Sequence, residues 1–125
     1  MTSTILFFII YIFYINCFPL NGNLVVIENN FGQQGGCITC NKTTREVHVS
    51  FALSFGNDTM QSGGLIYTFN SAFAPKIRKS IFGMAVQGDV LSYAQLVIHP
   101  NGEMRYHGSV GNASLMFFNG SYIYG

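Results

Sequence analysis

Beyond residue 20, the apolar positions fall into short runs rich in β-branched and aromatic residues, and almost every run is bounded by Gly, Asn, Pro or Ser. No stretch keeps the spacing of an amphipathic helix. This pattern is typical of an all-β sandwich. We predict strands at residues 24–28, 45–53, 64–69, 81–87, 91–99, 103–110, 115–118 and 121–124. Residues 29–36 and 41–44 are expected to be loops.

The run 45–53 alternates most regularly, which predicts one buried and one outward face. The inward set is Val47, Val49, Phe51 and Leu53, and the outward set is Glu46, His48, Ser50 and Ala52. Most other strands carry apolar residues on both faces. Either the sandwich is thick or neighbouring subunits cover its outer faces, and in a chain of 125 residues the second is more economical. The pattern therefore gives a first indication of an oligomer.

The stretch LVIHPNGEMRYHGSV, residues 96–110, predicts a β-hairpin. Pro100 presets φ at the second turn position, Asn101 suits the third, and Gly102 takes the left-handed conformation of a type I turn followed by a bulge. If His99 opens and Glu103 closes the turn, the register is fixed. It pairs Ile98 with Met104, Leu96 with Tyr106 and Ala94 with Gly108 on a core face.

The opposite face of this hairpin is expected to be solvated and to carry the candidate binding residues Tyr93, Gln95, Arg105 and His107. An aromatic plane beside fixed donors and acceptors is the combination that holds a sugar ring by stacking and hydroxyl hydrogen bonds. The same residues are also compatible with an ordinary solvated strand face or a subunit contact.

A longer connection, NSAFAPKIRK, occupies residues 70–79. We expect Phe73 to cap the core and Pro75 to stop any strand, because proline lacks the backbone N–H that a strand ladder needs.

The N-terminus holds a continuous apolar run, ILFFIIYIFYI, at residues 5–15. It is shorter than the ~20 apolar residues of a membrane-spanning helix and suits a signal-peptide core. However, no Lys or Arg precedes the run and no A-x-A-like cleavage site follows it. We therefore divide the chain into an apolar segment 1–20, which is a signal peptide, an anchor or a fragment artefact, and a β-sandwich head at 21–125.

Charged residues make up only 9% of the chain, and the formal net charge is +1. Such a surface attracts phosphate weakly, so nucleic acid is not an expected partner. The densest basic cluster is Lys76, Arg78 and Lys79. A neutral polar surface of Asn, Ser, Thr, Gly and Gln is common among extracellular and virion proteins.

Three cysteines cannot all pair within one chain, which disfavours a secreted disulfide scaffold. Cys37 and Cys40 form a C-x-x-C motif, but a redox pair needs a helix N-terminus that this stretch does not offer. A zinc site normally has a second close ligand pair, whereas the histidines come singly. We predict no metal or cofactor, and a loop or strand-end cysteine pair, reduced or bridged. The three histidines are His48, His99 and His107.

The five acidic residues stand alone in neutral stretches, and no G-x-S-x-G motif or phosphate-binding loop occurs. Nucleophilic or acid–base catalysis needs grouped residues, so we predict a non-enzymatic protein with no catalytic residue. Four N-x-S/T sequons would be glycosylated only if the chain entered a eukaryotic secretory route. They begin at Asn41, Asn57, Asn112 and Asn119.

The C-terminal two thirds resemble the head domains of tail-fibre, baseplate and receptor-binding proteins from phages of Gram-positive bacteria. The stretches that carry the resemblance are GLIYTFNSAFAPK (64–76), FGMAVQGDVLSYAQLVIHPNGEMRYHG (82–108) and FFNGSYIYG (117–125). The shared outline is a Phe-x-Pro connection (Phe73, Pro75), a Pro-Asn-Gly turn between two strands (Pro100, Asn101, Gly102) and a closing Ser-Tyr strand (Ser121, Tyr122).

The resemblance implies an antiparallel jelly-roll-like head, assembled as a homotrimer, that binds host cell-wall saccharides near subunit clefts. It also implies a place in the virion tail beside other tail or baseplate proteins. The family has no fixed sugar-binding motif, so no binding residue is carried over, and the apolar N-terminus departs from its pattern. The alternatives are a structural baseplate component without receptor contact, or a small secreted or surface-anchored β-sandwich glycoprotein. A hydrolase of envelope sugars is the enzymatic alternative.

Overall fold

The protein is almost entirely β in the computed structural model, which describes residues 24–31, 34–55, 59–109 and 111–125. The predicted all-β class is confirmed. The described strands are β1 (Leu24–Phe31), β2 (Gln34–Asn41), β3 (Glu46–Ser54), β4 (Met60–Gln61), β5 (Leu65–Thr68), β6 (Lys79–Gln87), β7 (Val90–Ile98), β8 (Glu103–Gly108), β9 (Asn112–Ala113) and β10 (Leu115–Ile123). One 3-10 turn, η1 (Ser71–Phe73), precedes β6. No helix in these ranges is long and apolar enough to cross a membrane.

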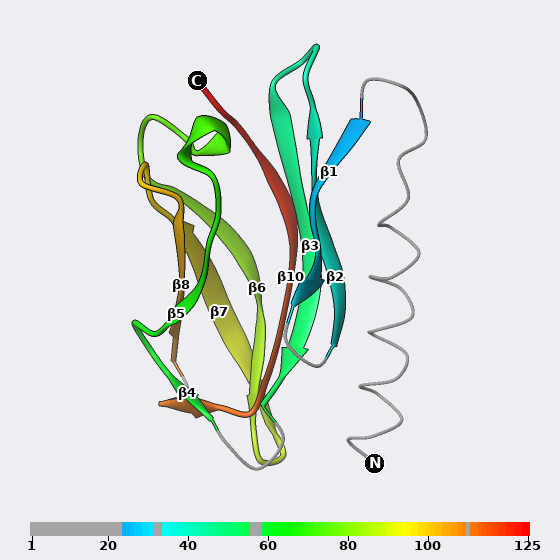
Figure 1. The fold of residues 1–125 in the computed structure, drawn as a ribbon. Coiled ribbons are helices and arrows are strands. Elements are labelled where there is room, and N and C mark those ends of the chain that lie inside the picture. The colour runs from blue at the N-terminus through cyan, green and yellow to red at the C-terminus, as the bar shows by residue number, and fades with distance from the viewer. Residues whose placement is uncertain (1–23, 32–33, 56–58, 110) are drawn as a thin grey trace.

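Eight of these strands form one curled antiparallel sheet in the order β1-β2-β3-β10-β6-β7-β8-β5, while β4 and β9 pair separately. The sheet folds back on itself, so that β1, β2, β3 and β10 face β6, β7, β8 and β5 across a shared interior (Figure 1). β10 pairs with β3 along its whole length, but with β6 only through residues 115–118. The C-terminal strand therefore joins the two halves of the sandwich.

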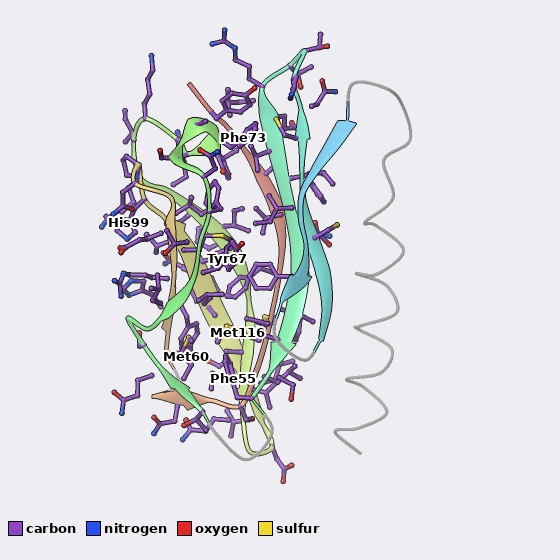
Figure 2. All side chains as sticks on the ribbon, in the orientation of Figure 1. Phe55, Met60, Tyr67, Phe73, His99 and Met116 are labelled. Carbon is purple, nitrogen blue, oxygen red and sulfur yellow. The ribbon has the colours of Figure 1, made fainter. Side chains whose placement is uncertain are left out.

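The core lies between these two layers, where the inward side chains of both interdigitate. Phe51 and Phe118 are neighbours there, with ring centroids 5.7 Å apart. Tyr67 and Met116 also point into this space (Figure 2). Fully buried side chains from both layers include Tyr106, Phe51, Phe118, Ile38, Leu96, Ile98, Met104 and Met116.

The predicted hairpin is confirmed, including its register. Within the turn the His99 N–H donates to the Glu103 carbonyl over 2.9 Å, the Gly102 N–H donates to the His99 carbonyl over 2.9 Å, and Gly102 has φ of +92°. Asn101 Oδ1 accepts a 3.0 Å bond from the Glu103 N–H. The predicted core-face pairs Ile98–Met104 and Leu96–Tyr106 are buried.

The alternation predicted along 45–53 is confirmed for its inward set, all of which is buried. The outward set is less exposed to solvent than predicted, because Ser50 and Ala52 are both 0% exposed. Ala52 pairs with Phe117 on β10, and cross-strand partners share a face, so that ring lies beside the small Ala52 side chain. The middle of β3 is therefore covered on both faces.

The loop predicted at residues 29–36 is wrong at both of its ends, because β1 runs on to Phe31 and β2 begins at Gln34. Gly36 pairs with Phe51, and a Cβ at residue 36 would stand 2.2 Å from the Phe51 Cβ. Glycine is required at residue 36 for close strand packing, whereas the sequence pattern placed this residue in a loop.

The two predicted strands 115–118 and 121–124 are one continuous strand, β10. The prediction placed a break at Asn119-Gly120 because this dipeptide is a common turn signal. Gly120 instead lies against the Ile81 side chain, where a Cβ would come within 2.7 Å of Cγ2. Strands β4 and β9 are too short, at two residues each, to give a periodic signal.

The connection 70–79 behaves as predicted. Asn70 Oδ1 caps η1 by accepting from the Ala72 N–H over 2.9 Å, and Pro75 is fully buried after the turn. Phe73 packs against the core, with its ring edge-on to Tyr124 at 5.6 Å, and its carbonyl accepts a 2.7 Å hydrogen bond from the Tyr122 hydroxyl. The predicted N-terminal segment 1–20, with Cys17, and the sequon at Asn57 lie outside the described residues.

Candidate functional site

An open groove of about 440 Å³ lies on the outer face of β6, β7 and β8, turned away from the core. Three of the four candidate residues, Tyr93, Gln95 and His107, line it. The remaining lining residues are Ser62, Arg78, Ser80, Val97, Gly108 and Ser109. The groove is thus polar around its rim, with one aromatic ring and one buried aliphatic side chain among its walls.

Strand pairing places the central residues of the groove side by side. Gln95 on β7 stands opposite His107 on β8, and Ser80 on β6 stands opposite Val97 on β7. Tyr93 follows two residues from Gln95 and therefore shares its face. The Gln95 amide donates to the Tyr93 hydroxyl over 3.3 Å, which orients both side chains along the strand.

The rim beside β8 is held by the turn that leads from β4 to β5. Ser62 Oγ accepts a 3.1 Å hydrogen bond from the Gly108 N–H, and the Gly63 N–H donates to the Tyr106 carbonyl over 2.6 Å. The Ser109 hydroxyl lies 2.5 Å from that of Ser92 at the same end. These hydrogen bonds tie the β4–β5 turn to β8 and the end of β8 to β7.

Arg105, the fourth candidate residue, lies on the same outer face but does not line the groove. Its Nε is 3.3 Å from Glu103 Oε1, and its Nη1 donates to the Gly63 carbonyl over 3.0 Å. The Gly63 carbonyl belongs to the β4–β5 turn, and Glu103 lies two residues before Arg105 on β8. Arg105 therefore supports the rim of the groove and is not directed into it.

An exposed apolar cluster adjoins the groove. Phe82, Leu91 and Tyr93 are 60%, 57% and 51% exposed, and the rings of Phe82 and Tyr93 are tilted by 30° with centroids 5.5 Å apart. Tyr93 belongs to both surfaces, with its hydroxyl toward Gln95 and its ring against Phe82.

Sequence reasoning did not select Arg78, Ser80, Ser62 or Ser109, although one signal was available for Ser80. Gly88 and Asp89 form a two-residue connection between β6 and β7, and Gly88 has φ of +61°. Recognising this hairpin fixes the register that brings Ser80 opposite Val97. Ser62 is brought to the groove by contacts between distant segments, which no local pattern reveals.

Cys37 and Cys40 lie inside β2, not in a loop, and both are buried. Residues three apart on a strand point to opposite faces, so the two thiols are separated by the sheet. A hydrogen bond with Cys40 raises the pKa of Tyr124. The pKa of Tyr122 is raised mainly by burial and, to a smaller extent, by the electrostatic effect of Cys40. Within the described ranges no three His, Cys, Asp or Glu side chains gather in a way that could hold a metal ion.

None of the described sequon asparagines lines the groove. Asn41 Oδ1 accepts backbone hydrogen bonds from Thr43 and Thr44 at 3.0 and 3.2 Å, which orders the β2–β3 turn. Asn112 and Asn119 are exposed on β9 and β10.

Comparison of the chain with models of known protein families and with curated proteins gives no match.

Proposed function

We propose that this protein is a non-enzymatic adhesion head that binds saccharide in the groove on the outer face of β6, β7 and β8. The observation that carries the proposal is the convergence of Tyr93, Gln95 and His107 in one pre-formed groove. The resemblance to phage receptor-binding heads extends the proposal to a jelly-roll-like homotrimer in a virion tail, attached to other tail or baseplate proteins. Its receptor is then a polysaccharide of the host cell wall.

The chemistry of the groove matches that of a sugar ring, which has apolar C–H faces and a rim of hydroxyl groups. Tyr93 and Val97 offer apolar surface, while Gln95, His107 and Ser80 offer donors and acceptors. The neighbouring rim is held by hydrogen bonds from the Gly108 N–H to Ser62 Oγ and from the Gly63 N–H to the Tyr106 carbonyl, so little ordering is required when a ligand binds. These features favour recognition of a sugar ring over catalysis.

A glycan array of Gram-positive envelope polysaccharides, probed with the full chain, tests the proposal. We expect binding that falls at least ~10-fold in Gln95→Ala and His107→Ala, because each change removes polar contacts with the ligand. His48→Ala is the matched control, since His48 lies on β3, away from the groove. Absence of binding to every polysaccharide, with a folded protein, would contradict the function.

The exposed cluster of Phe82, Leu91 and Tyr93 favours a second function, a structural tail component that holds subunits together. The pair Tyr93→Ala and His107→Ala separates the two functions. Loss of adsorption with intact assembly supports receptor binding. Loss of assembly in Tyr93→Ala, with saccharide binding retained in His107→Ala, supports the structural role.

A further inference from the structure

We propose that the saccharide bound in the groove carries an anionic substituent and that Arg78 binds that substituent. This inference rests on the proposed function, because it names the class of saccharide that the same groove takes. Arg78 lines the groove at the end where the 70–79 connection enters β6. Arg78 was noted in the sequence only as part of a basic cluster with Lys76 and Lys79.

The positive charge of Arg78 is not balanced by an acidic residue in the groove lining. Arg78 supplies a permanent positive charge and His107 a ring N–H donor, while none of the lining residues is Asp or Glu. Glu103, the acidic residue of β8, is engaged by Arg105 at 3.3 Å, and Asp89 lies in the turn at the far end of β6. No described carboxylate on these strands is therefore directed at Arg78.

The two arginines on this side of the sheet differ in how they are held. Arg105 is fixed by Glu103 and by the Gly63 carbonyl, and these bonds use two of its donors. Arg78 is exposed and makes no hydrogen bond or ion pair with another described residue. Its planar fork of N–H donors is thus available, and that fork matches the oxygens of a carboxylate, sulfate or phosphate group.

The ligand that fits both ends of the groove is a saccharide with an oxyanion. Its ring would contact Tyr93 and Val97 and hydrogen-bond with Gln95, while its oxyanion would be bound by Arg78. A uronate carboxylate, a sulfate ester and a phosphodiester share this chemistry. Binding measurements with ligands that carry one of these three groups each show which of them the groove takes.

The test compares ligands that differ only in charge. An oligogalacturonate and its methyl ester have the same sugar, with the carboxylates free in one and neutralised in the other. A sulfated and a phosphodiester-linked oligosaccharide, each beside its unsubstituted form, identify the other two sources, and inorganic phosphate alone tests for simple ion binding. Binding of the full chain is measured by calorimetry at low and high salt, for wild type, Arg78→Gln and Lys76→Gln. Lys76→Gln removes the same charge from an exposed residue that does not line the groove.

We expect at least one acidic ligand to bind ~10-fold or more tightly than its neutral form at low salt, and this preference to weaken as salt screens the charge. Arg78→Gln should abolish the preference while binding of the neutral form persists, and Lys76→Gln should retain it. Equal binding of acidic and neutral forms overturns the inference but leaves saccharide binding intact. An equal effect of the two substitutions overturns the role of Arg78. If inorganic phosphate binds but none of the saccharides does, or if no ligand binds, the inference is overturned together with the proposed function.

Discussion

Substitution of Gly102 by alanine tests the hairpin that supports the groove. Gly102 has φ of +92°, a backbone conformation that L residues adopt at a cost of about 1–2 kcal/mol. A Cβ at this position would also stand 2.2 Å from the Phe69 carbonyl oxygen. The hairpin backbone or the Phe69 segment must therefore move to accommodate one methyl group.

The matched control is Gly63→Ala. Gly63 has nearly the same φ, +93°, but nothing lies within 4 Å of the Cβ position. The control therefore carries only the conformational cost, about 1–2 kcal/mol. At residue 102 the clash adds about 1–3 kcal/mol of overpacking, and displacement breaks the 3.1 Å bond from the Phe69 N–H to the Gly102 carbonyl, worth about 1 kcal/mol. Gly102→Ala should thus exceed its control by at least ~2 kcal/mol.

Urea unfolding of the full chain, followed by far-ultraviolet circular dichroism, measures this difference. It corresponds to a difference in Tm of about 8 °C between the two variants, since 1 kcal/mol shifts Tm by roughly 4 °C in a domain of this size. If Gly102→Ala is no less stable than Gly63→Ala, the contact with Phe69 does not limit residue 102, and the reasoning fails.

Three further predictions concern the core, the thiols and the exposed apolar cluster. Because burial raises the pKa of Tyr122 above the value near 10 of an unfolded tyrosine, the unfolded state ionises first, and the contribution of Tyr122 to stability should be constant below about pH 10 and be lost at higher pH. Urea midpoints across this range should fall less steeply for Tyr122→Phe, and equal slopes would contradict the assignment. Cys37 and Cys40 should resist alkylation until urea unfolds the chain and should show no mutual disulfide in peptide mass mapping, because they are buried on opposite faces of β2. If the exposed cluster is a subunit contact, light scattering should show a trimer for wild type and a lower mass for Phe82→Ser, and a monomeric wild type would remove that function.

The fold class could be predicted because strand patterns are local. The hairpin at residues 99–103 is the best example, since the Pro-Asn-Gly turn alone fixes which residues pair and which face the core. The errors at Gly36 and Gly120 share one cause. Glycine was interpreted as a turn residue, whereas both glycines leave room for an approaching neighbour, Phe51 in one case and Ile81 in the other. Local composition does not contain that neighbour.

The candidate site was predictable to the extent that it lies on one hairpin. Tyr93, Gln95 and His107 share a face because strand side chains alternate, and this follows from the turn register. Arg105 follows the same alternation, yet its side chain is drawn to Glu103 and to the Gly63 carbonyl, which belongs to a segment more than forty residues earlier in the chain. Alternation gives the face of a residue but not the partner of its side chain.

The sequence by itself determined the β class, the outline of the strands around the hairpin and the inward face of β3, because these depend on alternation and turn chemistry over a few residues. Only the tertiary structure decided that β10 joins β3 to β6, that both faces of β3 are covered at Ser50 and Ala52, and that Ser62 and Arg78 meet the hairpin at the groove. These features depend on pairing between segments far apart in the chain. Many strand orders satisfy the same periodic pattern, and the packing of the whole core selects one of them.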